Sequence, residues 1–183
     1  MILLAIDPGF DATGWAVFDL AAPPRTLQDA VSGLKEAGEI ITRPADPDAL
    51  RLSQIGGQVH FLLTMWNPAG IAVEVPSYSG TYGRNTASRA SLNKLFMAIG
   101  AILSRAPGER VLTVPALTTP KETRHEILAN AARMVAKELP TGPRGGSRED
   151  AWDAIWLGCQ VLLERWSPLS PLERLNHALP ITL

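Results

Sequence analysis

Two short apolar runs separated by a long helical pattern constrain the fold of this chain more than any other feature. Residues Ile2–Ile6 are wholly apolar, and Ile71–Val75 are apolar apart from Glu74. A run this short and this apolar is typical of a strand that is buried on both faces of a sheet. Between the two runs, apolar residues recur at helical spacing from Pro47 to Trp66. A helix that connects two buried strands predicts a layered α/β domain.

Three further strands and three further helices follow from the same kinds of pattern. They are the strands Gly14–Leu20, Glu39–Arg43 and Val111–Val114 and the helices Ala87–Arg105, Pro120–Leu139 and Asp150–Trp166. We expect Asp46 or Asp48 to cap the first long helix, and Ala22–Val31, which holds two prolines, to be a loop or a short excursion. This order predicts a three-layer fold with a mixed five-stranded sheet, antiparallel at first and parallel where helices cross over. We expect one domain over residues 1–166 and a tail over 167–183.

The composition excludes several classes of protein. Apolar residues make up 46% of the chain and charged residues 19%, which is enough to bury a core and argues against disorder. No apolar run approaches the roughly 18 residues that a membrane helix needs. The chain starts without a basic leader and reaches Asp7 early, so we expect no signal peptide and a cytoplasmic location, in a bacterium or in the host of a bacteriophage. The lone Cys159 excludes a disulfide framework and a multi-cysteine metal site.

The net charge of −1 hides an uneven distribution. Residues 77–148 carry eleven basic and four acidic side chains, whereas residues 1–76 carry four basic and nine acidic ones. A basic middle segment between acidic ends is consistent with a surface that binds a polyanion such as DNA. Chance clustering on solvated helix faces accounts for the same distribution, so charge alone does not decide between the two.

Four carboxylates stand in places where surface acids are unusual. Asp7 ends one apolar strand and Glu74 lies inside another, while Asp150 and Asp153 share one face of the last helix. A desolvated acid is costly unless it is paired or binds a metal ion. If the two strands are neighbours, all four carboxylates meet at one spot. Four oxygen donors without His or Cys partners suit a hard cation such as Mg²⁺ or Mn²⁺.

Each of these acids also has a simpler explanation. Asp7 begins an Asp-Pro-Gly sequence and can simply start a turn. Asp150 follows Ser147 by three residues, which is the spacing of a capping box. Asp153 can be an ordinary solvated helix acid. Glu74 is the hardest to explain in this way, and the coincidence of all four favours a metal site.

Three blocks of this sequence resemble one known family. The blocks are Leu4-Ala-Ile-Asp-Pro-Gly-Phe-Asp-Ala-Thr-Gly-Trp-Ala-Val17, Ala72-Val-Glu74 and Asp150-Ala-Trp-Asp-Ala154. In order and at similar spacings, they resemble the acid-bearing motifs of the RuvC family of Holliday-junction resolvases, whose fold is ribonuclease-H-like. The resemblance runs from about residue 2 to residue 165. Asp-Pro-Gly alone is a weak signal, but the three blocks together are specific.

The resemblance implies a Mg²⁺-dependent endonuclease that cuts branched DNA as a homodimer, with Mn²⁺ able to substitute. Two metal ions roughly 3.5–4 Å apart activate a water molecule and stabilise the leaving 3′-oxygen in such enzymes. It further implies that Asp7 bridges the ions and that Glu74 binds one of them. Asp150 and Asp153 then bind the other ion or orient the water.

Candidate DNA contacts follow the strand that carries Glu74 and the strand Val111–Val114. They are Tyr78, Tyr82, Arg84, Arg89, Lys94, Lys121 and Arg124. The family usually carries an aromatic side chain in the loop after its glutamate, and neither tyrosine here stands at the usual offset. Members of the family commonly have two lysines ahead of the penultimate helix, where this chain has Lys121 followed by Arg124. We expect His125, next to Arg124, to be a surface histidine.

The helix Ala87–Arg105 carries apolar residues around much of its circumference, more than one buried face requires. Leu92, Phe96 and Leu103 are therefore candidates for the interface of the homodimer.

Three other interpretations of the sequence remain open. The turn after Asp7 also resembles the phosphate loop of actin- and hexokinase-like ATPases, although a second glycine-rich loop and the necessary length are missing. Another ribonuclease-H-like nuclease, which debranches DNA or cleaves RNA–DNA hybrids, would share the four acids. A non-catalytic junction-binding module would share the fold, but it would not be expected to keep every acid.

Overall fold

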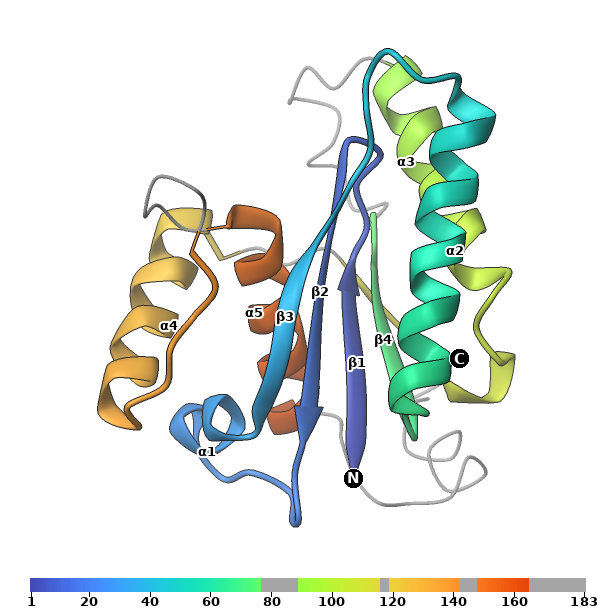
Figure 1. Ribbon diagram of the computed structural model, residues 1–183. Helices are drawn as coiled ribbons and strands as arrows, with labels where there is room; N and C mark the ends of the chain where they lie inside the picture. The colour runs from blue at the N-terminus through green and yellow to red at the C-terminus, as the bar shows by residue number, and fades with distance from the viewer. Residues whose placement is uncertain (77–88, 116–118, 142–147, 165–183) are drawn as a thin grey trace, which may run out of the picture.

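The computed structural model describes residues 1–76, 89–115, 119–141 and 148–164 of the chain (Figure 1). Its centre is one sheet with the strand order β3-β2-β1-β4-β5. The strands are β1 (Ile2–Asp7), β2 (Ala12–Asp19), β3 (Leu34–Ile41), β4 (Gly70–Val75) and β5 (Val111–Pro115). Strands β1, β2 and β3 pair in antiparallel fashion, whereas β4 pairs in parallel with both β1 and β5. The predicted mixed five-stranded sheet is confirmed.

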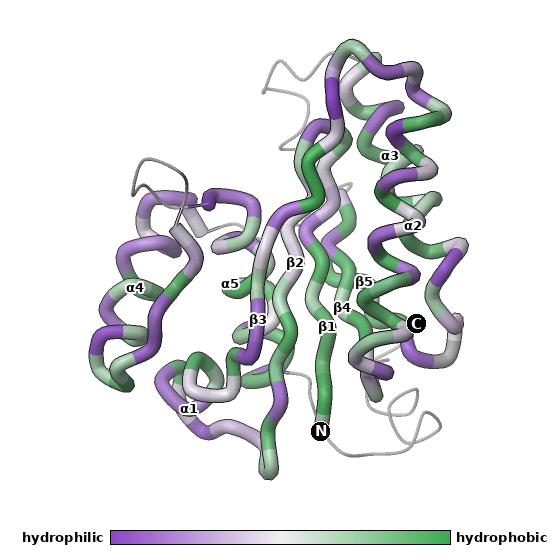
Figure 2. The backbone as a smooth tube through the Cα atoms, viewed as in Figure 1, coloured by the Kyte–Doolittle hydropathy of each residue, from purple (hydrophilic) through white to green (hydrophobic). Residues whose placement is uncertain are grey.

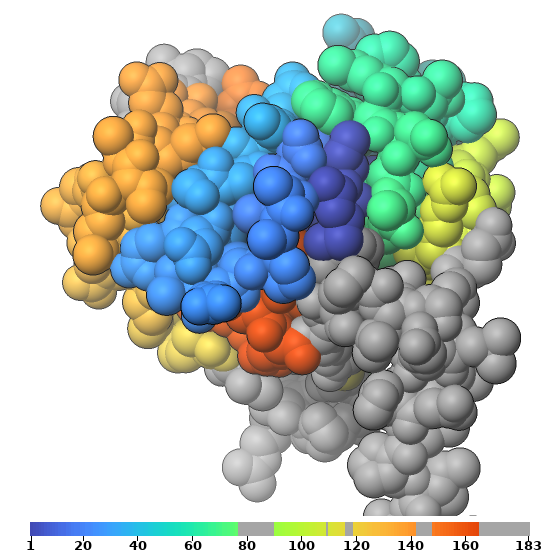
Figure 3. Space-filling view, turned by 90° about the horizontal axis from the view of Figure 1, so that it is seen from below, coloured from blue at the N-terminus to red at the C-terminus, as the bar shows by residue number. Residues whose placement is uncertain are grey.

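Helices cover both faces of this sheet and make three layers. They are α1 (Leu27–Ser32), α2 (Asp48–Trp66), α3 (Arg89–Leu103), α4 (Lys121–Met134) and α5 (Glu149–Glu164). One face carries α2 and α3, which pack on each other, and the opposite face carries α5 with α1 and α4 beside it (Figure 1). Seen from below, the start of β1 lies between α2 on one side and the segment around α1 on the other (Figure 3).

The core is split by the sheet into two apolar clusters. Leu3 and Ala5 of β1 belong to the cluster under α5, which also contains the buried Cys159. Leu4 and Ile6 belong to the cluster under α2 and α3. The alternation follows from the two-residue period of a strand. Figure 2 shows the apolar colouring along the central strand β1.

The structure differs from the sequence expectations at several element ends. The expected loop contains helix α1, which Thr26 starts as one half of a capping box with Asp29. Strand β3 begins at Leu34, five residues before the expected start. No side chain caps α2, since Pro47 occupies the N-cap position, so the expected capping by an aspartate is wrong. Helix α4 ends at Met134 and is shorter than expected.

Among the described helices, none combines the length and the apolar character that crossing a lipid bilayer requires. The expected tail at 167–183 lies outside the described residues, as does most of the segment between β4 and α3.

Candidate active site

Asp7 and Glu74 lie at the carboxyl ends of two neighbouring strands. Strands β1 and β4 are parallel, and Ile6 is the register partner of Val73. Asp7 and Glu74 are the next residues along each strand. The predicted adjacency of the two strands, on which the idea of a shared site depended, is therefore confirmed.

The start of α5 is brought to the same place by a close backbone contact. Gly14 of β2 is the cross-strand partner of Asp7, and a β-carbon added to Gly14 would lie 1.8 Å from the backbone oxygen of Asp150. Any side chain at this position would displace one of the two backbones. The absence of a side chain at Gly14 lets the first turn of α5 rest on β2 directly beside Asp7.

The electrostatics of Asp7 show that the four predicted acids act on one another. The pKa of Asp7 is raised well above its ordinary value, first by burial and then by the charges of Glu74, Asp153 and Asp150, while Arg124 opposes the shift. A carboxylate surrounded in this way gains from any cation that joins it.

Asp150 has its own set of charged neighbours. Its pKa is raised, with burial as the largest cause; Lys121 lowers it, and Glu39, Asp153 and Glu149 raise it. Glu39, on β3, was not among the residues that the sequence singled out.

Asp153 is held by three side chains of α4. Its Oδ1 accepts from Nη2 of Arg124 at 2.7 Å and lies 3.0 Å from Nε2 of His125. Its Oδ2 lies 3.3 Å from Nζ of Lys121. The simpler explanation of Asp153 as a solvated helix acid is wrong, because the residue is only 7% exposed.

His125 is also placed differently from the expectation. Its side chain is 15% exposed, contacts Asp153, and meets the ring of Trp152 edge-on with 5.2 Å between the ring centroids. The interpretation of His125 as a surface histidine is therefore wrong. The contact of His125 with Asp153 joins two helices that are far apart in the sequence. The sequence does not reveal such a long-range contact.

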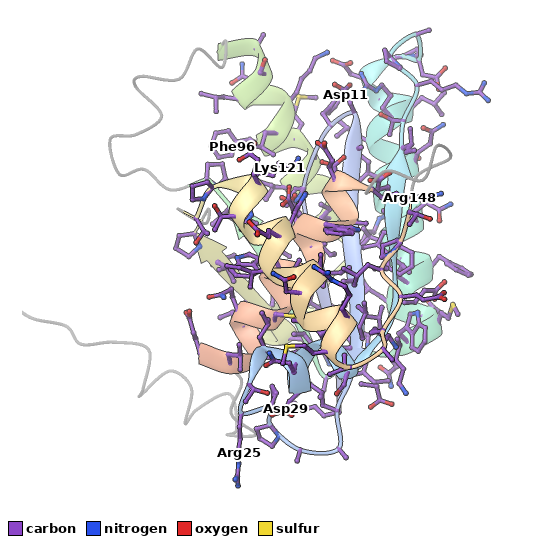
Figure 4. All side chains as sticks on the ribbon, turned by 90° about the vertical axis from the view of Figure 1, so that its left-hand side faces the viewer. Asp11, Arg25, Asp29, Phe96, Lys121 and Arg148 are labelled. Atoms are coloured by element: carbon purple, nitrogen blue, oxygen red, sulfur yellow. The ribbon has the colours of Figure 1, made fainter. Side chains whose placement is uncertain are left out.

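The predicted DNA contacts are spread over several elements. Lys121 lies at the same end of the domain as Asp11, opposite the end that carries Arg25 and Asp29 (Figure 4). Lys121 also pairs with Glu149 at 3.0 Å, and Arg124 donates to the backbone oxygen of Thr119. Tyr78, Tyr82 and Arg84 and the side chain of Arg89 lie outside the described residues.

Lys94, the remaining predicted DNA contact, lies on α3 away from the α4 side chains. Its ammonium group is 3.7 Å from Asp48 and lies over the ring of Phe10, 5.0 Å from its centroid. Whether any of these basic side chains binds DNA stays a prediction.

Arg51 of α2 is a buried charge that the sequence interpretation missed. Its Nε donates to Thr42 Oγ1 at 2.9 Å and its Nη2 donates to the Phe10 carbonyl at 3.2 Å. Nη2 also pairs with Asp11, and the guanidinium lies over the Phe10 ring, 4.1 Å from its centroid. These contacts fix the turn that directly follows Asp7.

A signal for Arg51 was present in the helical spacing. It precedes the buried Ile55 by four residues and Val59 by eight, so it belongs to the inner face of α2. An arginine on that face needs hydrogen-bond partners, and the turn at Phe10 supplies them.

The donor chemistry of the acids fits a hard divalent cation. As the side chains stand, the described residues include no group of three or more His, Cys, Asp or Glu side chains placed to hold a metal ion. The pKa of Asp7 is nevertheless raised, first by burial and then by the charges of Glu74, Asp153 and Asp150, at the point where β1, β4 and α5 meet. Carboxylate oxygens are the ligands that Mg²⁺ and Mn²⁺ prefer, so binding would require a local adjustment of side chains that already lie together.

Comparison with known sequences gives two similar proteins that carry the same name. No protein-family model matches the chain. The crossover junction endodeoxyribonuclease RuvC of Orientia tsutsugamushi strain Boryong is 30% identical over 104 residues, and that of strain Ikeda is 29% identical over 104 residues. In both cases the match spans 57% of this chain and 57% of the relative's length.

Comparison with solved structures extends the similarity over most of the chain. Thermus thermophilus RuvC in complex with a Holliday junction substrate matches with a TM-score of 0.64 and 19% identity, over 89% of this chain and 94% of that one. The yeast mitochondrial Holliday junction resolvase Ydc2 matches with a TM-score of 0.55 and 10% identity, over 96% and 82%. At such identities the likeness concerns the fold. The chain has the fold of these resolvases, and its predicted resemblance to the RuvC family is confirmed.

Proposed function

We propose that this protein is a structure-selective endonuclease that resolves four-way DNA junctions by metal-dependent hydrolysis of phosphodiester bonds. One observation carries the proposal. Asp7, Glu74, Asp150 and Asp153 come together where β1, β4 and α5 meet, in a fold shared with a RuvC that was solved in complex with a Holliday junction substrate. The curated relatives, of which this chain matches 57%, are named as crossover junction endonucleases.

The four acids have distinct roles in this proposal. Asp7 lies at the centre of the others and would bridge two Mg²⁺ or Mn²⁺ ions, with Glu74 on one ion and Asp150 on the second. Such ions supply an activated water and stabilise the leaving 3′-oxygen. Asp153, whose oxygens contact Arg124 and Lys121, would help to hold the second ion or would orient the attacking water.

In this proposal, basic side chains of α3 and α4 bind the phosphate backbone of the DNA. The side chains of Lys94 and Lys121 are 44% and 37% exposed, so both are accessible to phosphate oxygens. Arg124 is 12% exposed, so its positive charge attracts phosphate mainly without direct contact. Contacts of this type set affinity and orientation, not sequence preference.

The protein acts as a homodimer in this proposal, because symmetric cutting of a junction needs two active sites related by a two-fold axis. Helices α2 and α3 leave large apolar side chains at the surface, among them Phe61, Met65 and Phe96. Of the three residues that the sequence suggested for the interface, Phe96 is 43% exposed, whereas Leu103 packs against the core and Leu92 is partly buried. We therefore assign the interface to the outer surface of α2 and α3.

The test is incubation of the protein with a labelled synthetic four-way junction, with and without Mg²⁺. Duplex, flap and RNA–DNA hybrid substrates are run beside it. We expect paired, symmetric nicks in the junction that depend on Mg²⁺ and are abolished by Asp7→Asn. Equal or faster cleavage of the hybrid or the flap would instead indicate a different ribonuclease-H-like nuclease, and binding without cleavage under all conditions would indicate a junction-binding module.

A further inference from the structure

A fifth carboxylate, that of Glu39, stands in the same cross-strand row as Asp7. Asp7 of β1 is the register partner of Gly14 on β2, and Gly14 is the register partner of Glu39 on β3. Residues directly opposite one another in neighbouring strands turn their side chains to the same face of a sheet. Since strands lie about 4.8 Å apart, two strand spacings separate the backbones of Asp7 and Glu39.

The shared face is the one that α5 covers. On β3, Ala37 packs against the apolar cluster under α5, whereas Ile40 belongs to the cluster under α2 and α3. Glu39 alternates with Ile40 and matches Ala37, so its half-buried side chain faces α5.

The gap in the middle of the row is filled by α5. Gly14 has no side chain, and the space above it holds the backbone of Asp150, whose oxygen would lie 1.8 Å from an added β-carbon. Asp150 therefore lies between Asp7 on one side and Glu39 on the other. Glu39 and Asp150 are therefore close enough to interact electrostatically.

We propose that Glu39 is a further positioning residue of the metal site, whose carboxylate acts through Asp150 to strengthen the binding of divalent cations on the side away from Asp7. This inference rests on the proposed function, since it assigns a metal ion to the acids described above. A fixed negative charge next to a ligand stabilises a bound cation without touching it, and groups outside the ligand set commonly change metal affinity by about 10-fold or more.

The same strand offers a matched control. Glu36 carries the same side chain, lies opposite Val17 of the α2 and α3 cluster, and is exposed. It therefore points to the other face of the sheet. Glu39→Gln and Glu36→Gln remove the same charge from one strand, on opposite faces.

The experiment measures the dissociation constant for Mn²⁺ of the DNA-free protein by titration calorimetry. For Glu39→Gln we expect a dissociation constant about 10-fold larger than that of the wild type, and for Glu36→Gln an unchanged one. Glu39→Asp, which restores the charge on a shorter stem, is expected to recover most of the affinity. Junction cleavage by Glu39→Gln is expected to need a correspondingly higher metal concentration and to reach the wild-type rate at saturation, which a damaged fold would not allow.

The outcomes separate this inference from the proposed function. Equal Mn²⁺ affinity in the two glutamine variants would overturn the role of Glu39, while junction cleavage by the wild type would leave the proposed function in place. Weaker metal binding in Glu39→Gln together with a wild type that does not cut junctions would support Glu39 and overturn the proposed function. A wild type that binds no Mn²⁺ would overturn both.

Discussion

Gly14 and the backbone carbonyl of Asp150 are in contact across the boundary between β2 and α5, with no room for a side chain between them. Because Gly14 also pairs with Asp7, one contact sets the position of α5 relative to the strand that carries the central acid. The placement of Asp150 thus depends on a residue with no functional group.

Gly14→Ala is expected to push the start of α5 away from the sheet. A β-carbon at this position would lie far inside normal contact distance of backbone atoms, and overpacking of this kind costs about 1–3 kcal/mol of unfolding free energy. Chemical denaturation measures the loss, and cleavage should fall further than the unfolded fraction explains. Gly57→Ala is the control, because an alanine there meets nothing within 4 Å and should stabilise α2 slightly. An unchanged stability in Gly14→Ala would contradict the contact.

Asp7→Asn is expected to separate binding from cutting. The substitution keeps the shape of the side chain but removes the charge at the centre of the acids, so junction cleavage should fall below detection. Binding to the same labelled junction should persist, because the phosphate contacts come from the basic side chains and not from Asp7. Gel-shift and cleavage assays on one substrate measure both quantities. Near-normal cleavage by Asp7→Asn would refute the assignment of the metal site.

The metal-free protein is expected to lose stability as the pH rises. The pKa of Asp7 is raised in the folded state, with burial as the main cause, so the folded protein holds the Asp7 proton more tightly than the unfolded chain does. Its contribution to stability is complete below the ordinary carboxyl pKa and is lost as the pH rises through the folded-state pKa.

The comparison of wild type with Asp7→Asn isolates this contribution. In thermal unfolding at a series of pH values with a chelator present, the variant should gain stability over the wild type as the pH increases. Addition of Mg²⁺ should narrow the difference at neutral pH, because a ligand bound to the folded state stabilises it. A difference that does not change with pH would show that Asp7 titrates normally.

Arg51→Met is expected to loosen the turn after Asp7. The substitution removes the guanidinium that donates to the buried Thr42 oxygen and to the Phe10 carbonyl, and only the Thr42 hydroxyl still donates to that carbonyl. The loss of these buried hydrogen bonds costs about 1–3 kcal/mol. Amide hydrogen exchange should increase at Phe10 and Asp11, and cleavage should decrease with it. Arg43→Met, at an exposed position, is the matched control and should change none of these measurements.

Phe61→Asp and Phe96→Asp are expected to yield monomers. Both side chains are exposed apolar groups, one on α2 and one on α3, and a charge in an apolar interface is unfavourable. Light scattering at micromolar protein should give the dimer mass for the wild type and the monomer mass for the variants. Met134→Asp on α4, where the side chain is 73% exposed, should remain a dimer. A monomeric wild type would remove this prediction altogether.

The placement of an acid could be predicted from sequence where the strand or helix that carries it determines its surroundings. Asp7 and Glu74 interrupt apolar runs, and a helix between two such runs brings the strands side by side in parallel. Their adjacency required no knowledge of distant residues. The shared face of Asp150 and Asp153 follows from helical periodicity in the same way.

Other features depend on contacts between segments far apart in the sequence. The edge strand β3 contains Lys35 and Glu36, and its polar pattern concealed its true start. The partners of Asp153 come from α4, and Glu39 reaches the site only because Gly14 of the intervening strand admits α5. Neither contact produces a periodic pattern in the sequence, since each depends on how the helices pack on the sheet and on one another.

The strand order β3-β2-β1-β4-β5 places Asp7 on the central strand, which is hydrogen-bonded along both edges. A sheet opens from its borders inward, so the amides of β1 are expected to be the last to exchange with solvent. The buried acid on which the charges of the other three acids act is therefore on the strand that local unfolding reaches last. When an edge strand, β3 or β5, detaches from the sheet, Asp7 stays in place. The site then re-forms around Asp7 when the edge strand pairs again.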